Sequence, residues 1–144
     1  MIEQDTIKLL RECDAGVKMG VSSIDEVLER IQAKSFRRRM EDCKTEHEHL
    51  DREIQALLKD YQDDGKDPNP VAKSMSWMKT HMKLAADASD ETIADLMTDG
   101  CNMGVKSLYK YLNRYQAADE KSKDITKRLI HSEEQLVSDM HDYL

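Results

Sequence analysis

The segment Cys13-Asp14-Ala15-Gly16-Val17-Lys18 recurs as Cys101-Asn102-Met103-Gly104-Val105-Lys106, and this repeat shapes the prediction of the fold. Each copy lies in a long helical pattern that holds a Gly-x-x-x-Gly pair, Gly16 with Gly20 and Gly100 with Gly104. Glycine inside a helix costs up to about 1 kcal/mol relative to alanine, so it usually serves close backbone approach or a local distortion. Two interpretations stay open: a chance match between helices of similar composition, or two related helix pairs.

Two long helices are predicted in the first half of the chain. Over about 3–32, apolar residues recur at alternating spacings of three and four, and Asp14 is the only polar member of the stripe. Ser23-x-x-Glu26 resembles a capping box, but the stripe keeps its phase there, which favours one continuous helix. Residues 35–62 repeat the pattern with His47 as the polar member, and a segment containing Gly65, Pro68 and Pro70 ends this helix.

Three more helices are predicted over about 71–86, 91–116 and 119–143, and Ser89 or Asp90 is expected to cap the second of these. The first is short and has a methionine-rich side: Met75, Met78 and Met82, with Trp77 beside them. The pattern therefore predicts one all-α domain over residues 1–144. Its architecture is a four-helix bundle whose long crossover carries an additional short helix.

Composition excludes several classes of protein. The 144 residues include only 5 Gly and 2 Pro, and aromatic residues make up 5%, which argues against a β-sandwich or barrel. The net charge of −7 argues against nucleic-acid binding and against an anionic membrane. No apolar run is long enough for membrane insertion, and the N-terminus lacks a signal peptide, so a cytoplasmic location is expected. Cys13, Cys43 and Cys101 lie far apart, which predicts reduced thiols.

The middle of the chain resembles an uncharacterised bacterial branch of the ferritin-like four-helix-bundle superfamily. The resemblance is carried by Trp77-Met78, Lys83-Leu84, Asp90, Ile93-x-x-Leu96, Asp99-Gly100, Tyr109 and Leu112, with Asp14 and Gly20 as a looser match. It implies a duplicated helix pair joined by a long crossover, and it implies this fold more firmly than it implies any activity.

The di-metal site of ferritin-like proteins is expected to be incomplete here. Such sites take a carboxylate from each of two helices and Glu-x-x-His from each of the other two. Glu46-x-x-His49 matches this spacing, but the apolar stripe turns His49 towards solvent. No histidine follows Glu133 or Glu134 at the required offset. A working di-iron oxidase is therefore not expected.

A smaller constellation stays open to two interpretations. Asp14, His47, Cys101 and Glu133 each lie at or beside the inner face near mid-helix, and together they would offer one transition metal (Fe, Mn or Zn) mixed ligands. The alternative is a polar core layer that fixes helix register, to which Cys13, Cys43 and Asn102 also belong. We favour the layer without a metal, and we expect no catalytic cysteine.

These observations lead to a prediction of function in general terms only. The expected protein is a non-enzymatic bundle that self-associates, as a dimer by preference, or binds another partner. The methionine-rich side formed by Met75, Trp77, Met78 and Met82 either covers the bundle or forms the interface. The alternative is a metal-binding or redox protein that uses the mid-bundle polar residues.

Overall fold

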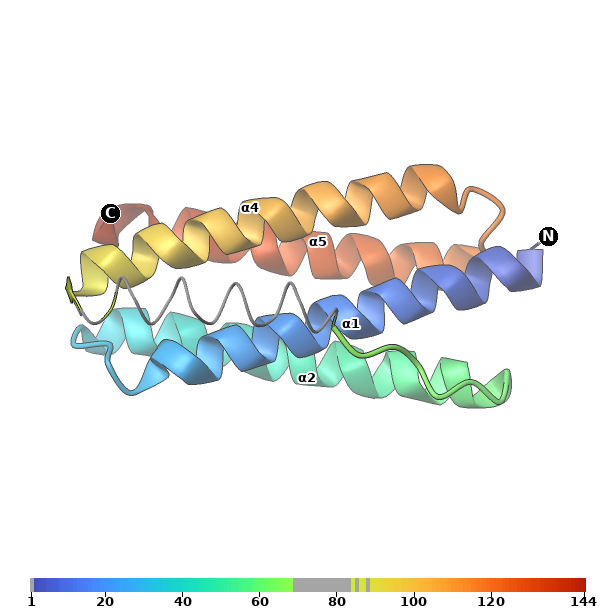
Figure 1. Cartoon of the computed structure of the whole chain (residues 1–144), viewed down its shortest axis with the longest axis horizontal. Helices are drawn as coiled ribbons and strands as arrows, with labels where there is room; N and C mark the ends of the chain where they lie inside the picture. The colour runs from blue at the N-terminus through green and yellow to red at the C-terminus, as the bar shows by residue number, and fades with distance from the viewer. Residues whose placement is uncertain (1, 69–83, 85, 88) are drawn as a thin grey trace.

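In the computed structural model, which describes residues 2–68, 84, 86–87 and 89–144, four long α-helices form a bundle (Figure 1). The helices are α1 (Ile2–Leu28), α2 (Lys34–Asp60), α4 (Asp90–Arg114) and α5 (Glu120–Met140), and a 3-10 turn, η1 (His141–Tyr143), follows the last one. The described residues contain no strand. The prediction of an all-α fold with four long helices is confirmed.

The helix ends follow the expected capping chemistry. Helix α1 continues through Ser22 and Ser23, as the unbroken stripe predicted, and stops at Leu28. Ser89 caps α4 by accepting a hydrogen bond from the Thr92 amide, and Asp119 caps α5 by accepting one from the Ser122 amide. The short helix predicted over 71–86, with Met75, Trp77, Met78 and Met82, lies outside the described residues except at Leu84 and Ala86.

Neighbouring helices run antiparallel (Figure 1), and hydrogen bonds from polar side chains join them at both ends of the bundle. At one end, the Asp90 carboxylate accepts hydrogen bonds from the amides of Gln32 and Ala33, at 2.8 and 2.9 Å. At the other end, Thr6 Oγ1 accepts a hydrogen bond from the Asp119 amide at 2.8 Å. Helix α2 ends at the opposite end of the bundle from the start of α4.

The core consists of two apolar clusters, one towards each end of the bundle. One is built around Phe36 and Met40, and the other around Ile54 and Leu129. Along α2 the first cluster extends to Cys43 and the second begins at Leu50, and His47 lies between them. Glu133 has the corresponding place on α5, between Ile130 and Leu136. The seam between the clusters is therefore the place where buried polar groups gather.

None of the described helices is both long enough and apolar enough to cross a membrane.

Candidate functional site

The buried pair at the seam consists of His47 on α2 and Glu133 on α5. His47 is 1% exposed, and its Nδ1 lies 3.0 Å from the carbonyl oxygen of Cys43. Because a carbonyl oxygen only accepts, Nδ1 must carry the hydrogen and donate it. The other ring nitrogen, Nε2, faces Glu133 Oε1 at 3.8 Å. The backbone of α2 therefore holds the imidazole in the orientation that directs Nε2 at the Glu133 carboxylate.

Two glycines make room for this pair. A Cβ atom added to Gly20 on α1 would lie 2.9 Å from the His47 ring, and one added to Gly104 on α4 would lie 2.6 Å from Glu133 Oε2. The second glycine of each Gly-x-x-x-Gly pair thus accommodates a polar side chain from the helix that follows α1 or α4 in the chain. The sequence predicted close approach of backbones instead.

The first glycine of each pair has a different environment. A Cβ added to Gly16 or Gly100 would meet no atom of residues 2–68, 84, 86–87 and 89–144 within 4 Å, and close helix approach at these two positions stays a prediction. Both glycines instead line a groove of about 450 Å³ between α1 and α4. No described side chain packs against these two glycines, and both border the groove.

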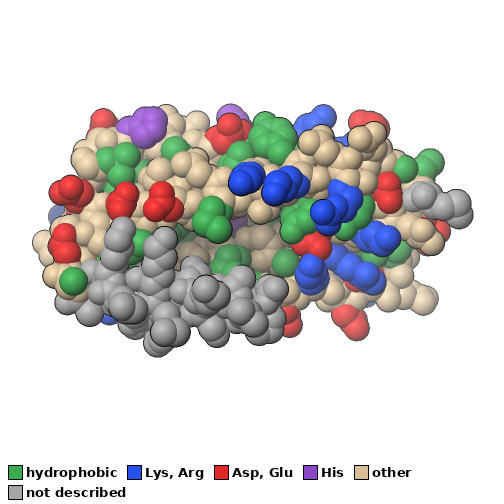
Figure 2. Space-filling view, turned by 45° about the horizontal axis from the view of Figure 1, so that its top comes forward, with side chains coloured by type: hydrophobic (Ala, Val, Ile, Leu, Met, Phe, Trp, Pro, Cys, Tyr) green, Lys and Arg blue, Asp and Glu red, His purple; other side chains and the backbone are tan. Residues whose placement is uncertain are grey.

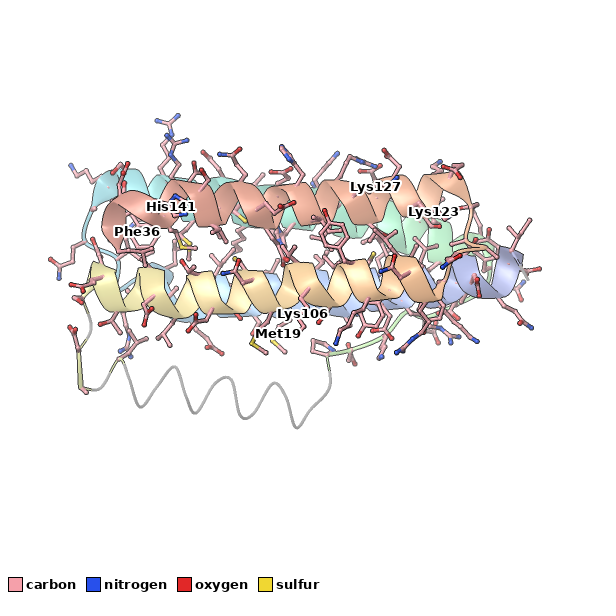
Figure 3. All side chains as sticks on the ribbon, turned by 90° about the horizontal axis from the view of Figure 1, so that it is seen from above. Met19, Phe36, Lys106, Lys123, Lys127 and His141 are labelled. Atoms are coloured by element: carbon pink, nitrogen blue, oxygen red, sulfur yellow. The ribbon has the colours of Figure 1, made fainter. Side chains whose placement is uncertain are left out.

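Glu133 contributes a buried oxygen to this groove. The residue is 8% exposed and lines the groove, and its Oε2 atom has no hydrogen-bond partner among the described residues. A buried acceptor left without a partner costs about 1–3 kcal/mol, so native structures rarely keep one without a role. The rest of the groove is mostly apolar; its larger side chains include Met19, Val27, Leu96, Met97, Leu108 and Tyr111. Met19 of α1, which is labelled in Figure 3, is one of these lining side chains.

The electrostatics of the seam disfavour acid–base and nucleophilic chemistry near neutral pH. Burial alone would lower the pKa of His47, but its interactions with Cys43 and Glu133 outweigh this and raise the pKa to about 10. The imidazole is then protonated at pH 7 and is a poor general base. Burial raises the pKa of Cys13 to about 12 and also raises the pKa of Cys101, so neither thiol supplies a thiolate.

The structure places Asp14 in another environment, where all its interactions are structural. Asp14 is fully buried and accepts hydrogen bonds from Lys18 Nζ at 3.0 Å and Gln55 Nε2 at 2.6 Å. It also accepts one from the backbone amide of Lys66 at 2.9 Å. Gly65, with a φ of 85°, packs so closely that an added Cβ would lie 2.2 Å from Asp14 Oδ2. Asp14 therefore anchors the chain after α2 to α1, and the structure does not bring it together with His47 and Glu133.

The other predicted members of the polar layer divide in the same way. Cys43 Sγ lies 3.6 Å from His47 Nδ1 and 3.8 Å from Ser132 Oγ, and Cys101 is buried close enough to Glu133 for the two to interact. Cys13 instead contacts Thr126 Oγ1 at 3.2 Å. Asn102 is exposed, because it lies on the outer face of α4 one residue after Cys101. Its assignment to the core layer was therefore wrong.

The residues do not fit the metal centre of ferritin-like proteins. Among the described residues, no group of three or more His, Cys, Asp or Glu side chains is placed to hold a metal ion. Glu46 and His49 are both exposed, as the phase of the stripe predicted. The Nδ1 atom of His47 is engaged with the Cys43 carbonyl, so Nε2 is the His47 nitrogen that faces the Glu133 carboxylate, and the Cys101 thiol lies near the same carboxylate.

Comparison with known proteins gives no match: no protein-family profile, no curated protein and no solved structure is significantly similar to the chain.

Proposed function

We propose that the protein is a non-enzymatic binding bundle that takes a small, uncharged amphiphile into the groove between α1 and α4. The observation that carries this proposal is the Oε2 atom of Glu133, which has no hydrogen-bond partner among the described residues; the residue is nine-tenths buried and lines a mostly apolar groove. A few convergent polar groups in an apolar cleft are typical of small-molecule sites.

The chemistry of Glu133 selects the head group of the ligand. Oε2 is an acceptor, so the ligand must donate a hydrogen bond. A protonated His47 already balances the charge of the carboxylate from the Oε1 side. A neutral donor such as a hydroxyl or an amide N–H therefore fits better than a second cation, and a carboxylate head would be repelled.

The groove selects the body of the ligand. Gly16, Gly100 and Gly104 leave width at its floor, and methionine and leucine side chains form apolar walls. Methionine adapts to varied shapes, which suits a flexible aliphatic chain. A volume of about 450 Å³ accommodates a medium-length chain with room to spare.

Self-association and the ferritin-like fold are part of this proposal. The antiparallel arrangement of the four helices, with α2 ending at the opposite end of the bundle from the start of α4, supports the ferritin-like resemblance. The single-metal alternative has less support, because no group of three or more His, Cys, Asp or Glu side chains among the described residues is placed to hold a metal ion. Elemental analysis of protein purified without chelator tests it, and Fe, Mn or Zn near one per chain would favour the metal site.

The ligand proposal is tested by calorimetric titration of the full chain with 1-hexanol and with methyl pentyl ether. The two probes have the same number of heavy atoms, but only the alcohol donates a hydrogen bond. We expect saturable binding of the alcohol and at least about tenfold weaker binding of the ether.

Two variants link this difference to the proposed acceptor. Glu133→Met removes the acceptor at similar length and is expected to abolish the preference for the alcohol. Glu134→Met makes the same change at the exposed neighbouring residue and should keep the preference. Equal affinities of the two probes for the wild type, or no binding of the alcohol, would overturn the proposal.

A further inference from the structure

The groove between α1 and α4 has a second group of polar side chains, away from the seam. Glu12 of α1, Tyr111 of α4 and Lys66 from the chain after α2 all line the groove. The Lys66 Nζ atom donates a hydrogen bond to Glu12 Oε1 at 2.6 Å. Glu12 is the first lining residue along α1 and Tyr111 the last along the antiparallel α4, so both mark the same end. We call Glu12, Lys66 and Tyr111 the polar end of the groove.

The chain after α2 is fixed in a way that brings Lys66 to the groove. The Lys66 amide donates a hydrogen bond to Asp14 at 2.9 Å, and Gly65, with its φ of 85°, packs against the same carboxylate. Arg11 pairs with Asp63 and ties the same segment to α1 a few residues earlier. The Asp14 anchor therefore has a consequence for the groove, because it sets the position from which the Lys66 side chain reaches Glu12.

The protonation states of the polar end give it both donors and acceptors near neutral pH. Burial and the nearby Glu12 carboxylate raise the pKa of Tyr111, so its hydroxyl keeps its hydrogen. The hydrogen bond to Glu12 raises the pKa of Lys66, so its ammonium stays charged. Lys66 and Tyr111 are therefore donors, and the Glu12 carboxylate is an acceptor.

The polar end and the seam lie about two helical turns apart. Gly104, whose added Cβ would meet Glu133 Oε2, precedes Tyr111 by seven residues. At a rise of 1.5 Å per residue this offset is about 10 Å along α4. Gly16 and Leu108 line the groove over the stretch between the two polar groups. The groove thus has one polar group at Glu133, a second at its end, and small or apolar residues between them.

We infer that the ligand of the groove is an uncharged chain with a polar group at each end, one bound by Glu133 and the other by the polar end. This inference rests on the binding function proposed above and adds the chemical class of the ligand. An extended chain of six carbons between two oxygens covers most of the distance between the two polar groups. Its apolar middle would lie against Leu108, and its two ends would fix its direction along the groove.

The polar end selects a group that both donates and accepts hydrogen bonds. Lys66 requires an acceptor and Glu12 requires a donor, and a hydroxyl or a primary amide supplies both. A carboxylate would be repelled by Glu12. An ammonium would be repelled by Lys66, and further basic side chains gather towards the end of the bundle where α1 begins (Figure 2). Because Lys66 and Glu12 balance each other's charge, an uncharged end group fits best.

The test compares 1,6-hexanediol with 1-heptanol in calorimetric titrations of the full chain. The two probes have the same number of heavy atoms and both offer a hydroxyl to Glu133, but only the diol has a polar group at its far end. A hydroxyl buried without a partner loses its hydrogen bonds to water, so an apolar end would bind the diol at least about tenfold more weakly. We expect the diol to bind at least as tightly as the alcohol.

Two variants assign this preference to the polar end. Lys66→Met and Tyr111→Phe each remove a donor and should weaken binding of the diol at least about fivefold, with little change for 1-heptanol. Tyr111→Phe keeps the ion pair of Lys66, so it stays informative if Lys66→Met loosens the chain after α2. Lys59→Met and Tyr109→Phe make the same changes at exposed residues that do not line the groove, and should leave both affinities unchanged.

The outcomes separate this inference from the function on which it rests. No saturable binding of either probe would overturn both. Binding of 1-heptanol with the diol at least about tenfold weaker would overturn the two-ended ligand alone. Equal weakening of both probes by Lys66→Met and by Tyr111→Phe would do the same, because the polar end would then serve only the fold. Tighter binding of 6-hydroxyhexanoate or 6-amino-1-hexanol than of the diol would overturn the uncharged end group.

Discussion

Asp14 and Glu133 are buried carboxylates of the same bundle, and they differ in how their oxygens are satisfied. Asp14 receives hydrogen bonds from two side chains and a backbone amide, which use both of its oxygens. Glu133 faces His47 with Oε1, and its Oε2 has no hydrogen-bond partner in the part of the chain that the structure describes. A buried carboxylate whose two oxygens both accept hydrogen bonds from the protein therefore has a structural role. A buried carboxylate with one oxygen that accepts none from the protein is available to bind a ligand.

The largest expected effect comes from changing each carboxylate to its amide. Asp14→Asn removes the charge that Lys18 pairs with and turns an amide donor towards existing donors. We expect it to lower the free energy of unfolding by about 3 kcal/mol. Glu133→Gln loses only an interaction at 3.8 Å and should change stability by about 1 kcal/mol or less. Urea denaturation measures both, and equal losses would remove the distinction between the two residues.

The next largest effect is the difference in stability between alanine substitutions at a glycine that contacts a seam residue and at one that does not. In Gly104→Ala the new Cβ displaces the Glu133 carboxylate, which we expect to offset the helix-propensity gain and lower stability by about 1 kcal/mol. In Gly100→Ala the new Cβ meets no described residue within 4 Å, and the substitution should raise stability by about 0.5–1 kcal/mol. Thermal melts of both variants give the comparison. A stabilising Gly104→Ala would contradict the packing at Glu133.

A smaller effect concerns Asp51, which lies beside Asp14. Partial burial and the negative charge of Asp14 raise the pKa of Asp51 to about 6, above its usual value near 4. The folded state therefore binds this proton more tightly than the unfolded chain. The resulting stability is fully present below about pH 4 and is lost as the pH rises through about 6.

Asp51→Asn imitates the protonated form and tests this directly. We expect it to raise the free energy of unfolding by about 1 kcal/mol at pH 7, a value reduced because the side chain is partly exposed. The gain should vanish near pH 4. Urea melts at the two pH values check the prediction, which a pH-independent change would contradict.

The helices and their inward faces could be predicted from the sequence because hydrophobic periodicity encodes both. The stripes placed Asp14, His47 and Glu133 at or beside the inner face, and all three are buried. The phase of α2 likewise turned His49 to solvent. Each of these predictions needed only the geometry of a single helix.

The composition of the site could not be predicted in the same way, because it depends on the axial offset between helices. Asp14 and His47 each lie on the inner face of their own helix, but at different heights along the bundle axis. Asp14 therefore contacts Gln55 and the Lys66 amide and not His47. The role of Gly65 depends on a contact across more than fifty residues of chain. The Gly-x-x-x-Gly pairs could have located the site in the sequence, because the second glycine of each pair lies at the same height along the bundle as the His47–Glu133 seam.

The most direct test of the contrast between the two carboxylates is an amide NMR titration of the wild-type chain with 1-hexanol. Gly104 lies against Glu133 and Gly65 lies against Asp14, so two glycine amides report on the two carboxylates separately. We expect the Gly104 signal to shift in a saturable way together with those of Gly16 and Gly100, while the Gly65 signal stays in place. A shift at Gly65 of equal size, or no saturable shift at Gly104, would contradict the account.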